Sequence, residues 1–315
     1  MSVETLLQKI TRVSVLIGSR NRPDVLFRCL ESVLNQDYPA LEVIVLDDAS
    51  DQVDLCQVLA EHFSDPRLRC LRSDIQLGVA GGRNRLMAEA TGDILCVIDD
   101  DAYFEDSNAI FRFVKSFCSD ESIGIVACKV VDHRQGNNDL LVPFPKRWRR
   151  HRPDIIERAQ YVSYYLGGCH AIRREVLNRC GMYAAELMFG EEELDLSYRA
   201  VAAGYRIYYE PAIVVHHHPQ ASVVAKGKKG EAKELYYHIQ NRLYLAYRYL
   251  PSRYVPVYLG IWLGQYLVKA VQNGTPITFF AGVRDGILRL KRYRRTPLDE
   301  KAQRYLREHY GRLWY

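Results

Sequence analysis

Short apolar runs alternate with amphipathic stretches through roughly the first 200 residues of the chain. Runs rich in Val, Ile and Leu are typical of buried strands, whereas apolar residues spaced three and four positions apart predict helices. The expected strands are residues 13–17, 42–46, 68–71 and 94–98. The expected helices are one that begins at Pro23 and two that cover residues 53–63 and 80–90. Strands that alternate with helical crossovers predict an α/β fold, with a mostly parallel sheet and helices on both faces.

The second part of the chain is less regular. Residues 124–131 and 161–166 are expected to form strands, and the polar, basic segment 132–160 between them is expected to be a long connection. Toward the C-terminus the pattern changes to helices rich in Tyr, Leu and Arg. We therefore expect an α/β domain over residues 1–225 and a C-terminal helical extension over residues 226–315.

Charge separates these two parts. The chain as a whole has a net charge of +5, but residues 226–315 contain 18 Lys or Arg and 6 Asp or Glu, a net charge of +12. A basic segment rich in aromatic residues is expected either to contact an anionic membrane surface or to be the solvated face of a helical subdomain packed on the sheet. We expect no nucleic acid as a partner. With 48% hydrophobic and 26% charged residues, the composition excludes collagen-like and wholly disordered chains.

No stretch of the sequence is expected to cross a membrane. The most apolar C-terminal segment, residues 255–271, is interrupted by Gln265 and Lys269, whereas a span needs about 20 mainly apolar residues. Residues 1–4 show no signal pattern of basic and then apolar residues. We therefore expect a cytoplasmic location, with peripheral contact to the inner membrane face as a further option.

Eight cysteines are spread over the chain without a Cys-x-x-Cys pair. Without an export signal, thiols inside apolar runs are more often small buried side chains than disulfides or zinc ligands. We expect no disulfide bond.

Acidic residues follow the predicted strands. Asp47 and Asp48 end the second strand, and residues 99–101, all Asp, end the fourth. Ligands of such sheets bind beyond the carboxyl ends of the strands, so these side chains and Ser19 are expected to meet at one edge. Adjacent carboxylates repel one another unless a cation neutralises them, and oxygen ligands suit Mg²⁺ or Mn²⁺. The pattern favours a metal site over an exposed acidic turn.

Two further clusters carry candidate chemistry. Residues 190–199 place four acids at the start of a predicted helix, where the helix dipole stabilises the charge that a general base needs. An acidic helix start also stabilises helices that have no catalytic role. Residues 216–218, all His, follow a predicted strand at 213–215, and imidazole is a common ligand of Mn²⁺-like ions. Such a cluster is otherwise an ordinary surface or core feature.

Nucleotide-binding signatures of other folds are missing. Neither Gly-x-Gly-x-x-Gly after the first strand nor Gly-x-x-x-x-Gly-Lys-Ser/Thr occurs in the sequence. The glycine-rich segment 78–84 opens a predicted helix, and its backbone amides or Arg83 are expected to approach a diphosphate. A tight helix entry would account for the same glycines.

Taken in order, these segments resemble the inverting family 2 glycosyltransferases with the GT-A fold. The resemblance covers about residues 11–220 and depends on the succession of motifs rather than on any one of them. The motifs are residues 13–22, 45–50, 78–84, 92–93 with 99–101, 167–168 and 192–196. The resemblance implies a metal-dependent transfer of a hexosyl or deoxyhexosyl group, in the synthesis of cell-surface polysaccharide or glycolipid.

The resemblance implies roles for residues that match the family pattern. The expected nucleotide-sugar contacts are Ser19, Arg20, Asp47, Asp48, Arg83, Asp99 and Asp100. The expected metal ligands are Asp99, Asp101 and His216, although which of the three histidines matches stays open. The general base is expected at Glu193, with Glu192 and Asp195 as alternatives, because the family usually has Asp at position 193. Gly18 replaces a common Pro, which is expected to change only the stiffness of the loop.

The implied partners follow from the same resemblance. The donor would be a UDP or dTDP sugar, the cofactor Mn²⁺ or Mg²⁺, and the acceptor a hydroxyl of a glycan or of a lipid-linked molecule. The apolar tail helices are also compatible with a homodimer.

Other functions stay open from the residues alone. A metal-dependent phosphohydrolase would use the acidic and histidine clusters without an acceptor. A membrane- or nucleic-acid-binding protein with an inactive catalytic domain would bind through its basic tail, with a steep salt dependence. A sugar-phosphate nucleotidyltransferase is disfavoured, because its glycine-rich, Arg-containing loop after the first strand is missing.

Overall fold

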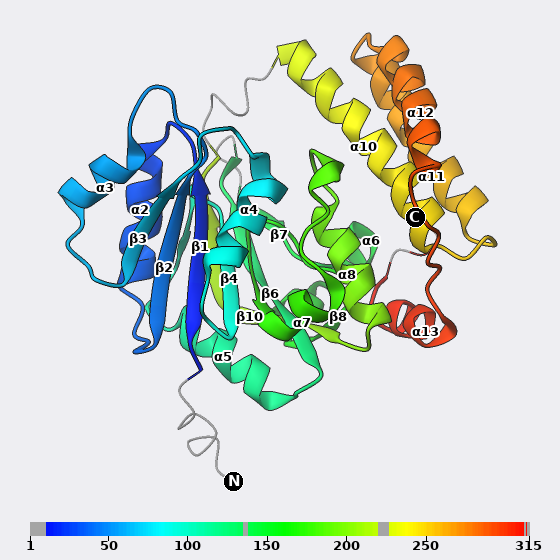
Figure 1. Ribbon diagram of the computed structural model, residues 1–315. Coiled ribbons are helices and arrows are strands. Elements are labelled where there is room, and N and C mark those ends of the chain that lie inside the picture. Colours follow the sequence, from blue (N-terminus) through cyan, green and yellow to red (C-terminus); the bar gives the residue numbers. More distant parts are fainter. Residues whose placement is uncertain (1–10, 135–137, 220–226, 312, 314–315) are drawn as a thin grey trace.

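The computed structural model describes residues 11–134, 138–219, 227–311 and 313. Two features predicted from the sequence lie outside these ranges. They are the absence of a signal pattern at residues 1–4 and the domain boundary between residues 225 and 226. In the described part of the chain, a ten-stranded sheet carries helices on both faces, and a bundle of C-terminal helices lies beside it (Figure 1). The predicted α/β fold with a C-terminal helical extension is confirmed.

The elements have the following bounds. The strands are β1 (Val13–Ser19), β2 (Leu41–Asp47), β3 (Leu68–Arg72), β4 (Ile94–Ile98), β5 (Ala102–Phe104), β6 (Ile123–Asp132), β7 (Asp139–Leu141), β8 (Gln160–Val162), β9 (Cys169–Arg173) and β10 (Arg206–His217). The helices before residue 219 are α2 (Pro23–Leu34), α3 (Leu55–His62), α4 (Gly78–Glu89), α5 (Ala109–Ser119), α6 (Lys146–His151), α7 (Arg174–Cys180) and α8 (Glu192–Ala202), with two 3₁₀ helices, η2 (Pro153–Glu157) and η3 (Ala185–Leu187). The C-terminal helices are α10 (Gly227–Tyr249), α11 (Val255–Gln272), α12 (Pro276–Leu290) and α13 (Glu300–Glu308).

The sheet has a parallel half and a mixed half. Its strand order is β3-β2-β1-β4-β9-β6-β10-β5, and the first four strands are parallel, as the sequence predicts. The inserted strand β9 runs antiparallel to both β4 and β6, and β5 and β8 are antiparallel to β10. Strands β5 and β9 were not predicted from the sequence. The strand expected at 161–166 is only β8, whereas the one expected at 213–215 is the end of the longer β10.

Each face of the sheet has its own core. On one face α2 and α5 bury apolar residues such as Leu30 and Phe113 against the sheet. On the other face α4, α7 and α8 contribute a second cluster, with residues such as Leu86 and Leu196. The regular spacing of apolar residues that predicted α2 is its buried face, and Pro23 stands at a first-turn position where its missing N–H costs nothing.

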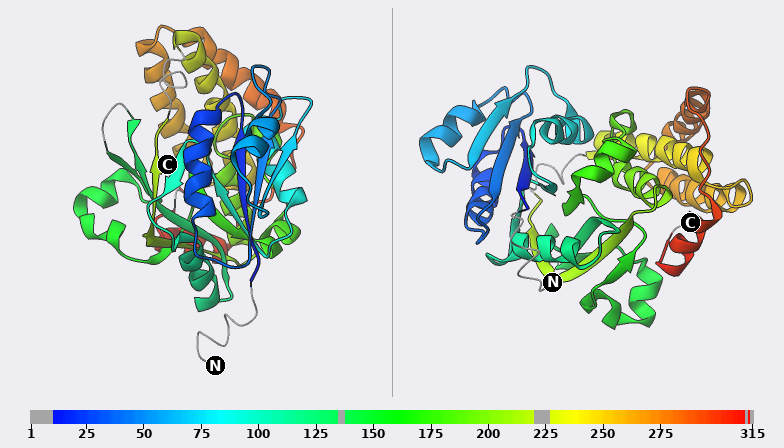
Figure 2. Two further views of the ribbon diagram at one scale, coloured as in Figure 1. Left: turned by 90° about the vertical axis from the view of Figure 1, so that its left-hand side faces the viewer. Right: turned by 60° about the horizontal axis from the view of Figure 1, so that its bottom comes forward.

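The C-terminal helices share the second core. Tyr244, Leu245 and Leu306 belong to the same buried cluster as Leu16 and Ile44 of the sheet. All views place α10, α11 and α12 side by side, on the opposite side of the sheet from α2 and α3 (Figure 2). The sheet and the C-terminal helices thus pack as one body. The division of the chain between residues 225 and 226 remains a prediction made from the sequence. None of the helices in the described residues has both the length and the apolar content needed to cross a bilayer.

One expectation about the cysteines is wrong. Cys56 on α3 and Cys70 on β3 form a disulfide, with their Cα atoms 5.4 Å apart. The pairing depends on how α3 packs over β3, which a sequence separation of 14 does not reveal. The other six cysteines, all within the described residues, are free thiols.

Candidate active site

A pocket of about 790 Å³ opens at the carboxyl ends of the central strands. Because β1, β2 and β4 are parallel, the residues that follow them meet at one edge of the sheet. The predicted residues that line this pocket are Ser19, Arg20, Asp48, Arg83, Asp99, Asp100 and Asp101. The pocket is also lined by residues of the C-terminal helices, among them Lys269 and Asn273. The site is therefore built from both parts of the chain.

Asp99, Asp101 and His217 form a cluster suited to a divalent ion. Each side chain offers one ligand atom, and these atoms lie within 4.8 Å of one another. Two carboxylate oxygens and an imidazole nitrogen are ligands that Mn²⁺ accepts readily. His217 Nε2 lies 3.1 Å from Asp101 Oδ1. Burial lowers the pKa of His217, but its contact with Asp101 outweighs burial and raises this pKa above its ordinary value.

The predicted ligand His216 lies outside this cluster. Side chains of a strand point alternately to opposite faces, so His216 and His217 lie on opposite faces of β10. His218 follows the strand and stacks on Tyr103 and His133, as His216 does. His216 packs against the ring of Tyr103, and its Nδ1 is 2.9 Å from Nε2 of His133. Of His216 and His217, it is therefore His217 that lies with Asp99 and Asp101.

Asp100 links the ends of β1 and β4. Its side chain is 1% exposed, accepts a 2.6 Å hydrogen bond from Ser19 Oγ and forms an ion pair with Arg22. Burial raises the pKa of Asp100 to about 7, against the opposing effect of the Arg22 charge. Arg22 also lies 3.2 Å from Asp101. Sequence reasoning gave no role to Arg22, although a basic residue directly after the first strand was a usable signal.

The remaining residues of the predicted nucleotide edge differ in position. Asp47 is fully buried and accepts hydrogen bonds from Ser50 N (2.8 Å) and Arg72 Nη1 (2.6 Å), so it stabilises the turn after β2 and does not reach the pocket. Asp48 lines the pocket while it accepts hydrogen bonds from the backbone amides that begin α4. Arg20 lines the pocket with its Nε donating to the carbonyl of the Ala49 turn.

Arg83 connects the metal cluster to the acidic helix. Its guanidinium is 7% exposed and lies 3.0 Å from Asp99 and 2.7 Å from Glu193. It also donates to the backbone oxygen of Gly167 and lies 3.6 Å from Glu192. Burial alone would lower the pKa of Arg83, but Asp99 and Glu193 raise it well above its ordinary value. Arg83 is therefore a fixed positive charge between two acidic groups.

Glu192 and Glu193 differ in what surrounds them. Glu193 contacts Arg83 and packs over Gly167, where an added Cβ would come within 2.5 Å of Glu193 Oε1. The predicted Gly-Gly motif thus leaves space for this carboxylate. Glu192 is more buried, and burial together with the Glu193 charge raises its pKa to about 8. Burial thus favours the neutral form of Glu192 at neutral pH, whereas Glu193 is the member of the pair that contacts Arg83 at 2.7 Å.

Asp195 faces away from these groups. It is fully buried and accepts hydrogen bonds from Tyr244 (3.0 Å) and Tyr249 (2.5 Å) of α10, and it pairs with Arg199 one turn later. Two residues along a helix correspond to about 200° of rotation, so Asp195 and Glu193 lie on nearly opposite faces of α8. This arrangement makes Asp195 an anchor for α10 and removes it as a candidate base.

The turn that precedes α8 is held by α10 through contacts that sequence reasoning missed. Glu191 has a left-handed backbone conformation (φ 67°) and a buried side chain that lies 2.9 Å from Arg242 and 3.1 Å from His238 of α10. The amide nitrogen of Asn241 lies 2.9 Å from the backbone oxygen of Gly190. His238, Asn241 and Arg242 lie in a helix that has many polar residues, so nothing in the sequence of α10 pointed to their contact with α8.

Comparisons with known proteins agree with this geometry. The family model described as Glycosyl transferase family 2 matches residues 14–181. The Escherichia coli protein WfaP, named a UDP-Glc:alpha-D-GlcNAc-diphosphoundecaprenol beta-1,3-glucosyltransferase, is 32% identical over 92 residues, which cover 29% of this chain and 36% of WfaP. The succinoglycan biosynthesis protein ExoO of Rhizobium meliloti is 33% identical over 95 residues, which cover 30% of this chain and 27% of ExoO. The chain thus spans only about a third of the length of these relatives.

Solved structures with low sequence identity share the fold. A mannosyltransferase from Pyrobaculum calidifontis, solved with GDP-Man and Mn²⁺, superposes with a TM-score of 0.56 at 20% identity over 95% of this chain and 79% of its own. TarS residues 1–349 from S. aureus, solved with UDP-GlcNAc, gives a TM-score of 0.62 at 16% identity over 93% and 83%. Because the family model covers more than half of the chain and the GT-A neighbours share its sheet, the chain belongs to glycosyl transferase family 2.

Proposed function

We propose that this protein is an inverting, metal-dependent glycosyltransferase. It moves a hexosyl or deoxyhexosyl group from a nucleoside-diphosphate sugar to a hydroxyl of a glycan or lipid-linked acceptor. The observation that carries the proposal is the bridge made by Arg83, which contacts Asp99 of the metal cluster on one side and Glu193 on the other. A single displacement requires a base on one side of the anomeric carbon and a stabilised leaving group on the other. Arg83 holds the candidate residues for these two tasks near each other.

The donor is proposed to be a UDP sugar, with a dTDP sugar as the alternative. TarS was solved with UDP-GlcNAc and GalNAc-T7 with UDP, GalNAc and Mn²⁺, which favours UDP for a chain of this fold. Ser19, Arg20 and Asp48 border the part of the pocket proposed for the nucleotide. A panel of UDP and dTDP sugars in the transfer assay identifies the sugar that is transferred.

Asp99, Asp101 and His217 would hold the metal ion, for which we propose Mn²⁺ ahead of Mg²⁺ because one ligand is imidazole. When bound, such an ion stabilises the negative charge that develops on the diphosphate leaving group. Arg22 forms ion pairs with Asp101 of this cluster and with the buried Asp100 beside it, and so holds both carboxylates in place.

Glu193 is proposed as the general base. Its carboxylate accepts the proton of the acceptor hydroxyl while that oxygen forms a bond to the anomeric carbon and the bond from this carbon to the diphosphate oxygen breaks. Arg83 holds the carboxylate at 2.7 Å and fixes its direction. Attack from the face opposite the leaving group inverts the anomeric centre.

The acceptor is proposed to be a lipid-linked saccharide used in cell-surface polysaccharide or glycolipid synthesis. Support comes from the printed name of WfaP, which includes a diphosphoundecaprenol acceptor, and from that of ExoO, a succinoglycan biosynthesis protein. A lipid-linked acceptor resides in a bilayer, so the proposal also requires that the protein works at a membrane surface.

The test is a transfer assay with a panel of UDP and dTDP sugars, Mn²⁺ and lipid-linked saccharide acceptors. The product anomer, read by NMR, is expected to be inverted relative to the donor. Glu193→Gln is expected to lower kcat by about 100-fold or more. Glu192→Gln, the matched control, should keep most of the activity, because Glu192 is largely neutral at pH 7.

Three results would contradict the proposal. They are a product that keeps the donor's anomeric configuration, an unchanged kcat for Glu193→Gln at saturating substrates, and metal-dependent phosphate release that needs no acceptor. The last of these would point to a phosphohydrolase.

A further inference from the structure

Most of the exposed large apolar side chains in the described residues lie on two neighbouring helices. These residues are Val257, Leu267, Val268 and Val271 on α11 and Ile277, Phe280, Ile287 and Leu288 on α12. Their exposed fractions range from 37% for Leu267 to 83% for Ile277. A concentration of this kind on one part of the surface marks a site of interaction with a partner or a membrane. We call these eight residues the α11–α12 face.

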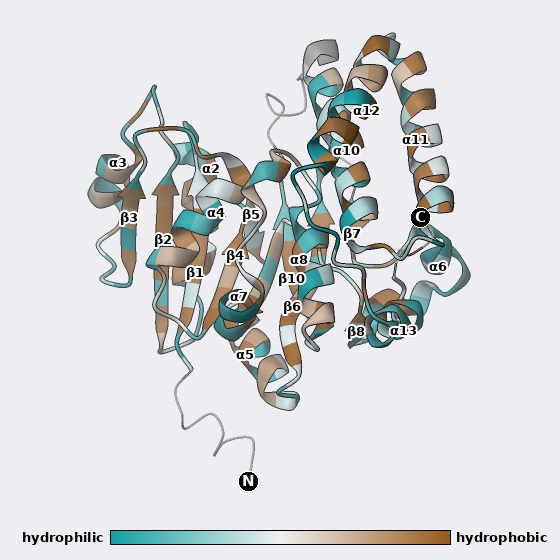
Figure 3. Cartoon of the chain, turned by 45° about the vertical axis from the view of Figure 1, so that its right-hand side comes forward, coloured by the Kyte–Doolittle hydropathy of each residue, from teal (hydrophilic) through white to brown (hydrophobic). Residues whose placement is uncertain are grey.

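The exposure is not caused by poor packing of the helices. Ala270 of α11 and Phe279 of α12 are buried in a small core together with Ile239 of α10. Gly286 lets α12 approach α10 so closely that an added Cβ would lie 2.6 Å from Leu243. Each helix therefore packs on α10 through some of its residues and exposes other apolar positions, which are brown in Figure 3. Helices that are apolar on both sides are typical of a buried or membrane-contacting environment.

The charge around the α11–α12 face is basic. Residues 255–295 contain seven Lys or Arg and one Asp or Glu. Lys269, Lys291 and Arg292 are exposed. Apolar side chains flanked by Lys and Arg match the acyl and headgroup layers of a bilayer that contains anionic lipid. A partner surface of the same basic charge, such as a second copy of this segment, would be repelled.

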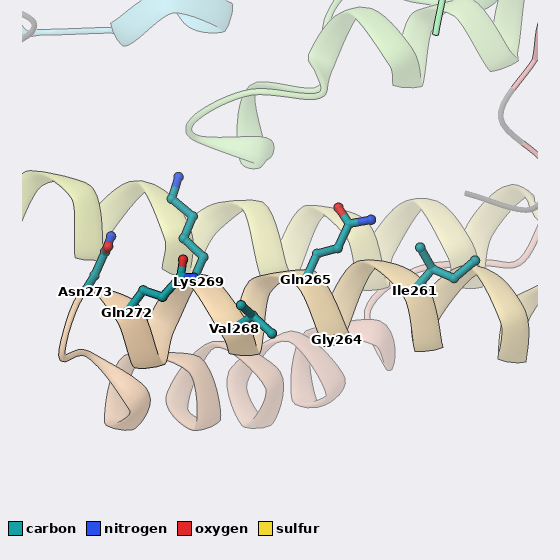
Figure 4. Close-up of a pocket in the computed structure, with 7 residues that line it drawn as sticks. All are labelled: Ile261, Gly264, Gln265, Val268, Lys269, Gln272 and Asn273. Atoms are coloured by element: carbon teal, nitrogen blue, oxygen red, sulfur yellow. The ribbon is translucent and has the colours of Figure 1, made fainter. Parts of the chain in front are cut away.

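The face is continuous with the candidate active site. A shallow pocket runs along α11 from Ile261 to Asn273, and Lys269 points out of the helix beside it (Figure 4). Lys269 and Asn273 line this pocket and the catalytic pocket alike. The turn between α11 and α12 also lies on the same side of the molecule as the carboxyl ends of the parallel strands (Figure 1). A surface that contacts the α11–α12 face therefore lies next to the site where the acceptor is expected.

We propose that the α11–α12 face inserts its apolar side chains into the headgroup region of an anionic lipid bilayer. Docking in this way sets the catalytic pocket at the membrane surface with Lys269 between the pocket and the lipid. The delivery of a lipid-linked acceptor by this route rests on the proposed function, whereas the docking itself does not. The basic residues draw the protein to the surface, and the apolar side chains hold it there.

The experiment measures binding of the full chain to vesicles of phosphatidylcholine alone and of phosphatidylcholine mixed with phosphatidylglycerol, by sedimentation. The protein is expected to bind the anionic vesicles and to be released by salt. Ile277→Ser combined with Phe280→Ser is expected to weaken this binding roughly tenfold or more, because two large apolar side chains leave the lipid. Phe111→Ser is the matched control: Phe111 is 37% exposed on α5, which packs on the other face of the sheet, and its replacement should leave binding unchanged.

A second variant tests the electrostatic part. Lys291→Glu combined with Arg292→Glu should reduce binding to the anionic vesicles and leave the weak binding to neutral vesicles as it was. Circular dichroism confirms that each variant is folded.

The proposal is overturned if the chain binds neither kind of vesicle, or if the Ile277→Ser, Phe280→Ser variant binds as well as the unaltered chain. It is also overturned if the face drives a concentration-dependent dimer that these changes abolish, without vesicle binding. Stabilisation by UDP with Mn²⁺ is the separate readout for the proposed function. This stabilisation should be equal in the unaltered chain and in the variants made to weaken vesicle binding. If UDP with Mn²⁺ stabilises none of them, that result contradicts the glycosyltransferase proposal and not the membrane proposal.

Discussion

At the scale of single residues, the site consists of carboxylates that already have cationic partners. Arg22 contacts Asp100 and Asp101, and Arg83 contacts Asp99 and Glu193. These pairs keep four buried or half-buried acids close together before any ligand binds, which is the arrangement that an anionic donor and a divalent ion require. What distinguishes the individual carboxylates is therefore their partners rather than their residue type.

The two histidines 216 and 217 give a matched pair for the metal site. His217→Ala is expected to raise the Mn²⁺ concentration needed for stabilisation by UDP by about tenfold or more, because a ligand is lost. His216→Ala should shift it little, because His216 contacts His133 and Tyr103 on the other face of β10. The measurement is a thermal-shift titration with Mn²⁺ at fixed UDP. Equal shifts for the two variants would refute the assignment of His217.

Glu192 makes stability depend on pH. Its pKa is about 8 in the folded protein and 4.5 in its ordinary state, so between these values the folded chain keeps a proton that the unfolded chain has lost. Stability is therefore lost as pH rises from about 4.5 to about 8 and is not affected by this group at lower pH. Glu192→Gln should remove the loss.

We expect Glu192→Gln to be more stable than the unaltered chain at about pH 8, by on the order of a few kcal/mol, and nearly equal to it at about pH 5. Urea unfolding at both pH values measures the difference. A gain of equal size at the two pH values would mean that another effect of the substitution dominates.

At the scale of elements, α10 fixes the start of α8. Arg242, His238 and Asn241 hold the turn at Gly190 and Glu191, and Tyr244 and Tyr249 hold Asp195 one turn further on. Helix α8 carries Glu192 and Glu193 between these two attachments. The extension thus determines where the candidate base lies, although the base itself belongs to the α/β part of the chain.

This arrangement predicts that Arg242 acts as a positioning residue. Arg242→Met should lower kcat by about 10- to 100-fold with little change in the KM for the donor, because the base shifts while the nucleotide pocket stays intact. It should also lower the stability, because Glu191 loses a buried partner. Adding Glu191→Gln should restore the stability but not the rate.

Arg304→Met, an exposed change on α13 of the same extension, is the control and should leave both quantities unchanged. A raised KM with unchanged kcat for Arg242→Met would instead place Arg242 in donor binding.

At the scale of the whole molecule, the sheet edge and the C-terminal helices make one site. The catalytic pocket is lined by Asp99–Asp101 from the sheet and by Lys269 and Asn273 from the α11 segment. The buried cluster on the same face of the sheet includes residues from β1 to α13. The extension is therefore part of the enzyme's core and of its pocket, and its outer face is what the membrane proposal concerns.

The parallel half of the sheet and the acids at its carboxyl edge follow from the pattern of residues along the chain. Runs of β-branched and aliphatic residues separated by amphipathic helices leave little choice of architecture, and parallel strands bring their ends together. Hence the sequence alone was enough to place Ser19, Asp48 and Asp99–Asp101 in one site. These predictions depend on local pattern and on a topology rule.

The tertiary structure decided the contacts that join distant parts of the chain. The phase of β10 selects His217 over His216, and the rotation of α8 directs Glu193 to Arg83 but Asp195 to α10. The Cys56–Cys70 disulfide and the Glu191–Arg242 pair likewise join segments whose proximity no spacing reveals. Residue types and local periodicity fix which groups are present, whereas packing between elements fixes the direction in which each side chain points.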